Sequence, residues 1–123
     1  MTSVACVTEV IYPGAAPDSP GCQALLMVLE VADIEVRPGS EDDFAAAYRG
    51  AREVLLGTPG CRSARMTRGV ESPSRFVLLV EWDSVAAHEE NFRQSDRFGT
   101  WRAAIGPFFA GPPRVEHFAD LDS

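Results

Sequence analysis

The stretch Arg75-Phe-Val-Leu-Leu-Val-Glu-Trp82 decides the fold, because it is long enough for a strand and is largely apolar on both faces. Side chains alternate between the two faces of a strand, so one face carries Phe76, Leu78, Val80 and Trp82 and the other carries Val77, Leu79 and Glu81. Asp83 and Ser84 follow at once, and a serine in this position can cap a helix. We therefore expect a strand covered on both faces that leads into a helix, with Trp82 at the rim of a cavity between them.

The rest of the chain supplies the partners of this strand. An upstream strand pattern runs from Ala24 to Arg37, and Ser40 with Asp43 resembles a capping box that opens a strongly amphipathic helix ending at Gly57. The further predicted elements are a strand at 61–68, helical segments at 84–93 and 96–105, and a last strand at 114–119. The order is strand, helix, strand, strand, helix, strand. This order predicts an α+β fold of the ferredoxin-like βαββαβ type, with a four-stranded antiparallel sheet.

Two helices can cover only one face of such a sheet. The predicted first strand and the strand at 75–82 are both apolar on their second face, which includes Met27, Leu29 and Val31. A monomer would expose these side chains to water, so we expect a homodimer whose sheets pack face to face around a two-fold axis.

A chain of 123 residues has room for one domain, which we place at residues 24–123. Residues 1–23 form an arm rich in turn-forming residues before that domain. The arm is either a loose extension or the source of an additional edge strand at 7–11, and the sequence pattern leaves both open.

The composition excludes several classes of function. A net charge of −7 disfavours nucleic acids and anionic membranes as partners. All eleven basic residues are arginine, so Schiff-base chemistry through a lysine is excluded. The three cysteines, Cys6, Cys22 and Cys61, lack the spacing of a zinc site and indicate a reducing compartment. We expect a cytoplasmic protein without a metal.

Two polar residues fall on apolar helix faces. His88 shares a face with Val85 and Phe92, so it should point inward as a catalytic base or as a core histidine bonded to a backbone carbonyl. Arg102 shares the apolar face of the next helix, as a ligand-binding group or as the buried partner of Glu81.

The candidate catalytic residues are therefore Trp82, which can also be plain core filling, together with His88 and Arg102. The candidate substrate-binding residues around them are apolar and suit a flat aromatic ligand: Phe76, Leu78, Phe92, Phe98 and Trp101. His117 lies beside Arg114 and Glu116 in the last strand, and we assign it a structural or interfacial role.

The chain resembles the antibiotic biosynthesis monooxygenase (ABM) domain family over residues 25–120. The resemblance rests on the strand from Phe76 to Trp82 with the Asp-Ser after it, and on His88, Asn91-Phe92, Ser95, Trp101-Arg102 and Val115-Glu-His-Phe118. It implies a dimeric α/β barrel. In the polyketide-tailoring members it also implies oxidation of anthrone-type phenols to quinones by molecular oxygen, without flavin, haem or metal.

The resemblance also assigns roles. Trp82 matches the tryptophan of those members, Arg102 their pocket arginine and His88 a polar, tyrosine-type group, whereas their asparagine corresponds to Leu78. Haem-degrading relatives need an asparagine near Ala32 and a more distant histidine, so haem degradation is disfavoured.

The sequence thus predicts a small cofactor-independent monooxygenase that oxidises a phenolic, anthrone or hydroquinone-like substrate. His88 would remove the proton and Arg102 would stabilise the resulting anion. The alternative, suggested by Leu78, is a non-catalytic module of the same fold for small-molecule binding or dimerisation.

Overall fold

The computed structural model describes residues 27–121 and follows the predicted order of elements. Strand β2 (Val28–Glu35) is followed by helix α2 (Glu41–Leu56) and by strands β3 (Cys61–Arg68) and β4 (Arg75–Trp82). A π-helix, η1 (Ala87–Arg93), then leads into helix α3 (Asp96–Ile105), a short 3-10 turn η2 (Gly106–Phe108) and strand β5 (Arg114–Phe118).

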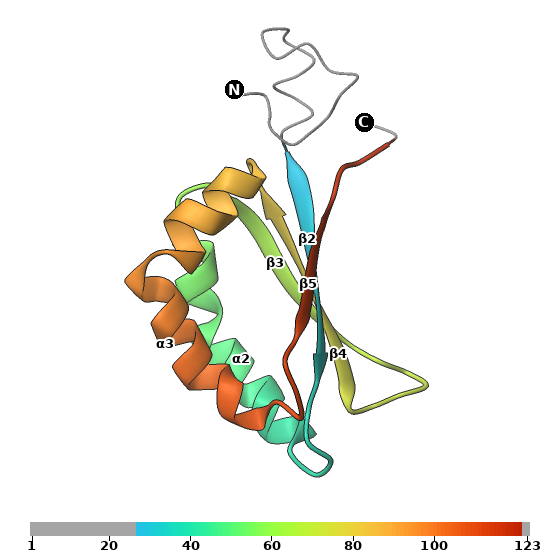
Figure 1. The fold of residues 1–123 in the computed structure, drawn as a ribbon. Coiled ribbons are helices and arrows are strands. Elements are labelled where there is room, and N and C mark those ends of the chain that lie inside the picture. Colours follow the sequence, from blue (N-terminus) through green and yellow to red (C-terminus); the bar gives the residue numbers. More distant parts are fainter. Residues whose placement is uncertain (1–26, 122–123) are drawn as a thin grey trace, which may run out of the picture.

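The four strands form one antiparallel sheet in the order β3-β4-β2-β5, with both long helices on the same face (Figure 1). This arrangement confirms the α+β, ferredoxin-like prediction. The register of the central strand places Val80 of β4 on one side of Glu30 and His117 of β5 on the other. Two strands distant in sequence, β4 and β5, therefore flank one residue of β2.

The core lies between the helices and the sheet. It is built from the apolar face of α2, the inner face of α3 and alternate residues of β2 and β4; its fully buried large side chains are Val36, Phe44, Leu55, Val80, Trp82 and Ile105. Aromatic rings make up much of this core. Phe44, for example, packs against Phe76 with ring centroids 4.7 Å apart. Burial of side chains this large supplies the main driving force for folding.

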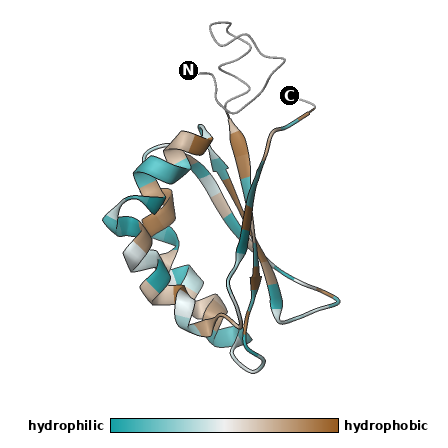
Figure 2. Ribbon diagram, viewed as in Figure 1, coloured by the Kyte–Doolittle hydropathy of each residue, from teal (hydrophilic) through white to brown (hydrophobic). Residues whose placement is uncertain are grey.

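The opposite face of the sheet carries no helix among the described residues (Figure 1), and the central strands are rich in apolar residues (Figure 2). Leu29, Val31, Val77 and Leu79 remain only partly buried on this face. Phe118, opposite Leu29 on β5, is 48% exposed. The predicted bare face is therefore present in the monomer.

Three local expectations differ from the structure. Ser40 precedes α2 but makes no side-chain cap, and its backbone N–H donates to the carbonyl of Arg37 and not to Asp43, so the predicted capping box is not formed. Val85 is 36% exposed and does not share the buried face of His88. The helix predicted at 84–93 is capped by Ser84 but continues as a π-helix.

The arm, including the edge strand considered at 7–11, lies outside the described residues. Within residues 27–121, every helix is too short or too polar to cross a lipid bilayer.

Candidate functional site

Glu30 is a carboxyl group in the middle of the apolar core. Its position on β2 follows Val28 and precedes Ala32 on the face that the helices cover, and the residue is only 5% exposed. The indole N–H of Trp82 donates a hydrogen bond of 2.8 Å to Glu30 Oε1. Buried carboxyl groups are costly unless they are bonded, so this pairing explains why the glutamate is tolerated.

His88 packs against the same two residues. Its ring stacks on Trp82 with centroids 4.9 Å apart and a 19° interplanar angle, and Phe92 packs on it at 6.0 Å. His88 Nε2 lies 3.4 Å from Glu30 Oε1. The π-helix η1 presents both His88 and Phe92 inward, and such wide turns are frequent at functional sites.

The second ring nitrogen of His88 faces a second histidine. His88 Nδ1 lies 2.8 Å from Nε2 of His117, which reaches inward from β5. The expectation of a core histidine bonded to a backbone carbonyl is therefore wrong, because the described partners of its ring nitrogens are Glu30 and His117. Glu30, His88 and His117 form a continuous polar chain through the core.

Burial dominates the protonation of this chain. It raises the pKa of Glu30 to about 7, although the hydrogen bond from Trp82 and the charge of Arg93 act in the opposite direction. Burial lowers the pKa of His88 to about 3, helped by His117 and Arg93. At neutral pH the His88 ring is therefore uncharged, and the Glu30 carboxyl is protonated in part of the molecules. Their 3.4 Å contact is accordingly not an ion pair.

A cavity of about 380 Å³ opens onto this chain between the sheet and the C-terminal helices. The polar chain contributes Glu30 and His88 to its wall, and two arginines, Arg93 and Arg102, also line it. Its walls are otherwise apolar and include Leu78, Phe92, Phe98, Trp101 and Val115. An apolar cavity with a few convergent polar groups is typical of small-molecule sites.

Arg102 lies at this cavity in a different environment from the one expected. The residue is exposed, and its guanidinium lies 5.8 Å from the ring centroid of Phe98 and 5.9 Å from that of Phe109. Glu81 is bonded to Ser63 instead. The prediction of a buried Arg102–Glu81 ion pair is therefore wrong. Cation–π contacts hold the arginine at the cavity instead.

The structure brings most of the predicted site residues together at this cavity: Leu78, His88, Phe92, Phe98, Trp101 and Arg102. Trp82 is fully buried and does not line it, so the expected position at the rim is wrong. Its ring lies behind His88 and acts on the cavity only through Glu30 and His88.

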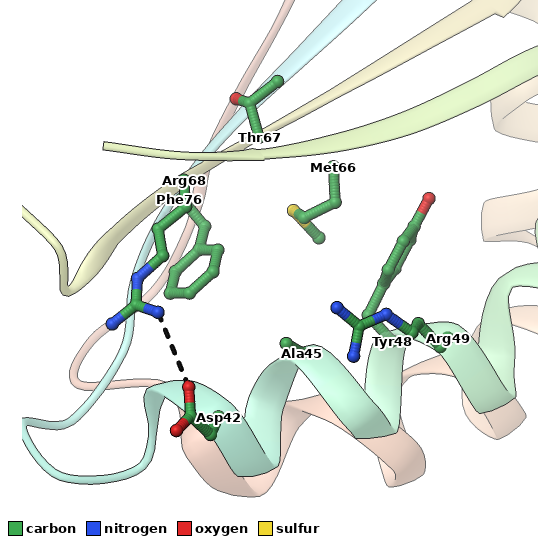
Figure 3. A pocket seen from close by; sticks show the side chains of 8 residues that line it. All are labelled: Asp42, Ala45, Tyr48, Arg49, Met66, Thr67, Arg68 and Phe76. Atoms are coloured by element: carbon green, nitrogen blue, oxygen red, sulfur yellow. Dashed lines mark ion pairs between the residues drawn. The ribbon is translucent and has the colours of Figure 1, made fainter. Parts of the chain in front are cut away.

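Phe76 lines a separate cavity of about 330 Å³ between α2 and the β3–β4 hairpin (Figure 3). There, Arg68 pairs with Asp42 at 3.5 Å, and the side chains of Met66 and Tyr48 lie between helix and sheet. The Tyr48 hydroxyl is buried without a hydrogen-bond partner among the described residues. In Figure 3 it points away from the Arg68–Asp42 pair, so it does not converge with those charges.

His88, Glu89 and His117 place possible metal-ligand atoms within 4.8 Å of one another. The 2.8 Å contact between the two imidazoles, however, has the length of a hydrogen bond and needs a proton on one nitrogen. A protonated nitrogen cannot bind a metal ion, so this geometry fits a hydrogen-bonded chain. That the protein uses no metal stays a prediction.

Comparison with known proteins places this geometry in context. The family model described as antibiotic biosynthesis monooxygenase matches residues 27–104. The uncharacterised protein YczJ of Bacillus subtilis is 34% identical over 95 residues, which cover 77% of this chain and all of that protein.

Solved structures point to the same family. A Bordetella bronchiseptica protein, provisionally named an antibiotic biosynthesis monooxygenase, is 40% identical with a TM-score of 0.75, over 77% of this chain and 97% of its own. SnoaB of Streptomyces nogalater, a cofactor-independent oxygenase, is 14% identical with a TM-score of 0.69, over 79% of this chain and 95% of its own. At that identity the likeness to SnoaB concerns the fold alone.

Proposed function

Because the chain belongs to the antibiotic biosynthesis monooxygenase family, we propose that it is a cofactor-independent monooxygenase acting on a phenolic, anthrone or hydroquinone-like compound. The observation that carries this proposal is the placement of a buried proton-accepting pair, Glu30 and His88, in the wall of an apolar cavity. A cavity of about 380 Å³ is within the size range of small-molecule sites and suits an aromatic substrate.

The first step of this reaction is the removal of a proton from the substrate, which needs a base. Removal of a proton from an anthrone or phenol leaves an electron-rich anion that can reduce molecular oxygen itself. A carbon–oxygen bond then forms to give a hydroperoxide, and loss of water from a CH–O–OH group leaves the carbonyl of a quinone. The protein has to bind the substrate, accept the proton and exclude water.

The site divides these tasks among its residues. His88 and Glu30 act together as the candidate base. Both ring nitrogens of His88 face a partner, so the substrate proton is taken up at the Glu30 carboxylate, whose pKa is about 7, and His88 beside it carries the proton on. Arg102 is the candidate group for the developing anion, since its guanidinium makes no ion pair with a described residue. Trp82 supports both by fixing Glu30 and His88.

Oxygen uptake with a panel of anthrones and hydroquinones tests this proposal. We expect turnover above the spontaneous rate, reduced roughly 100-fold or more in His88→Gln, because a positioned base contributes at least that factor. Arg102→Gln should also lower turnover, whereas Arg97→Gln on the exposed side of the same helix is the control. Binding of these compounds with no turnover in the wild type would favour the non-catalytic module instead.

The bare sheet face supports a homodimer, in line with the dimeric α/β barrel that the family resemblance implies. Leu29, Val31, Val77 and Leu79 form an apolar strip along the sheet centre, and each such side chain gains about 1.5 to 3 kcal/mol when it is fully buried. Two copies packed through this face would hide both strips, which gives an interface of the obligate kind.

Sedimentation at low micromolar concentration should therefore report about twice the chain mass. Leu79→Glu places a charge in the strip and should shift the protein to unfolded or aggregating monomer. Val70→Glu adds the same charge in the β3–β4 hairpin, where Val70 is 88% exposed, and should sediment as the wild type. A well-folded wild-type monomer would show that this face does not pair.

A further inference from the structure

The polar chain of the core does not end at the cavity. Glu30 faces the cavity and is nearly fully buried, whereas His117 is only partly buried on the outer strand β5. His88 bridges them, with Nε2 at 3.4 Å from the carboxyl and Nδ1 at 2.8 Å from His117 Nε2. His117 has no role in the proton abstraction proposed above.

The donor and acceptor atoms of this chain allow two arrangements of its protons. When Glu30 is ionised, His88 carries its proton on Nε2 and points it at the carboxylate, and His88 Nδ1 accepts the Nε2–H of His117. When Glu30 is protonated, its O–H points at His88 Nε2, so the His88 proton sits on Nδ1 and points at His117 Nε2. The proton of His117 is then on Nδ1.

The two arrangements differ by one proton along the whole chain. A proton leaves Glu30 for His88 Nε2, the His88 proton moves from Nδ1 to His117 Nε2, and the proton on His117 Nδ1 goes to solvent. Neither imidazole has to rest as a cation, which agrees with burial lowering the pKa of both histidines. The 3.4 Å contact has to shorten by a few tenths of an ångström for the first transfer.

We propose that His117 is the outer end of a proton relay that connects the buried carboxyl of Glu30, through His88, with solvent. The relay rests on the proposed function only for its use in turnover, where it resets the base after each proton abstraction. His117 acts through His88 and is a positioning residue, because it does not line the cavity.

Two charged neighbours act on the relay in opposite directions. The carboxylate of Glu89 favours a proton on His117 and opposes ionisation of Glu30, and the guanidinium of Arg93 acts in the opposite sense on all three groups. These two residues pair with each other at 3.7 Å on η1. Their opposed charges partly offset each other, and burial is the larger influence on the pKa of each of the three groups.

The first test needs no turnover. Nitrogen-15 NMR distinguishes the two imidazole tautomers, and both histidines should switch from Nδ1–H to Nε2–H together as the pH rises through the titration of Glu30, near pH 7. In Glu30→Gln the switch should be lost. Tautomers that stay fixed while the Glu30 carboxyl titrates, or a histidine that becomes cationic in the same range, would overturn the relay.

The second test uses turnover in whichever aromatic substrate the oxygen-uptake panel identifies. His117→Gln keeps a side-chain N–H that can bond His88 Nδ1 but cannot pass a proton on. We expect kcat to fall about 10-fold with an unchanged KM, and imidazole added to the buffer to restore part of it. Glu90→Gln removes an exposed acid from η1 and should leave kcat unchanged.

Each outcome has a separate meaning. Coupled tautomers without turnover would support the relay and reject the oxygenase, whereas turnover with an unaltered kcat in His117→Gln would reject the relay alone. Tight Zn²⁺ binding by the wild type and not by His117→Gln would also overturn it, because a metal ion would replace the shared proton.

Discussion

Glu30→Gln is expected to become more stable relative to the wild type by about 2 to 3 kcal/mol as the pH rises from 5 to 8. The reason is the pKa of Glu30, which burial raises from 4.5 to about 7 in the folded chain. Between these values the folded chain holds a proton that the unfolded chain has released, so the wild type loses stability as the pH rises. Glutamine has no proton to lose there.

Urea unfolding of both chains at pH 5 and pH 8 measures this difference. The titration of His88 runs in the other direction, because its lowered pKa makes the folded chain more stable as the pH rises from about 3 to 6.5. Both chains share His88, so their difference isolates the carboxyl. Glu35→Gln, at the exposed end of β2, is the control for loss of a charge. A constant difference would mean that Glu30 is ionised at little cost.

The fold was predictable because periodicity and turn chemistry agree along most of the chain. The bounds predicted for β3, β4 and α3 are those of the structure, since Gly, Pro and Ser residues mark their ends. The π-helix was not predictable from spacing, because His88 and Phe92 are four residues apart in either kind of helix. Only the backbone bonds, such as Gln94 N–H to Glu89 O, distinguish them.

The polar chain was predictable only in part. His88 was found because a lone histidine shares a helix face with an apolar residue, and Glu30 offered the same signal on β2, between Val28 and Ala32. The site residues predicted from the sequence do not include Glu30. His117 could not be assigned, since its partner depends on the β2–β5 register, which places it directly opposite Glu30.

Arg102 shows the limit of helical periodicity. Its spacing from Phe98 and Ile105 predicted an inward arginine with an acidic partner, but a long side chain can leave the apolar face and place its charged end at the surface. The guanidinium does so here and lies near the rings of Phe98 and Phe109. Periodicity therefore placed the residue at the correct cavity and in the wrong environment.

Trp82→Ala is expected to destabilise the protein by about 3 to 5 kcal/mol, because it removes the largest fully buried side chain of the core. Trp82→Phe separates packing from hydrogen bonding. It keeps an aromatic ring against His88 but removes the N–H that donates to Glu30. In the wild type this hydrogen bond lowers the pKa of the Glu30 carboxyl.

The cost of Trp82→Phe should therefore depend on pH. At pH 5 the Glu30 carboxyl is protonated, and the cost is mainly lost packing. At pH 8 the wild-type carboxyl is ionised, so the variant also loses a charged hydrogen bond, which adds about 1.5 to 3 kcal/mol to the cost. Phe92→Leu alters the same aromatic cluster without removing a donor, so its cost should be the same at both pH values. An equal cost of Trp82→Phe at pH 5 and pH 8 would show that the indole N–H does not stabilise the ionised Glu30, and Trp82 would then serve this site by packing alone.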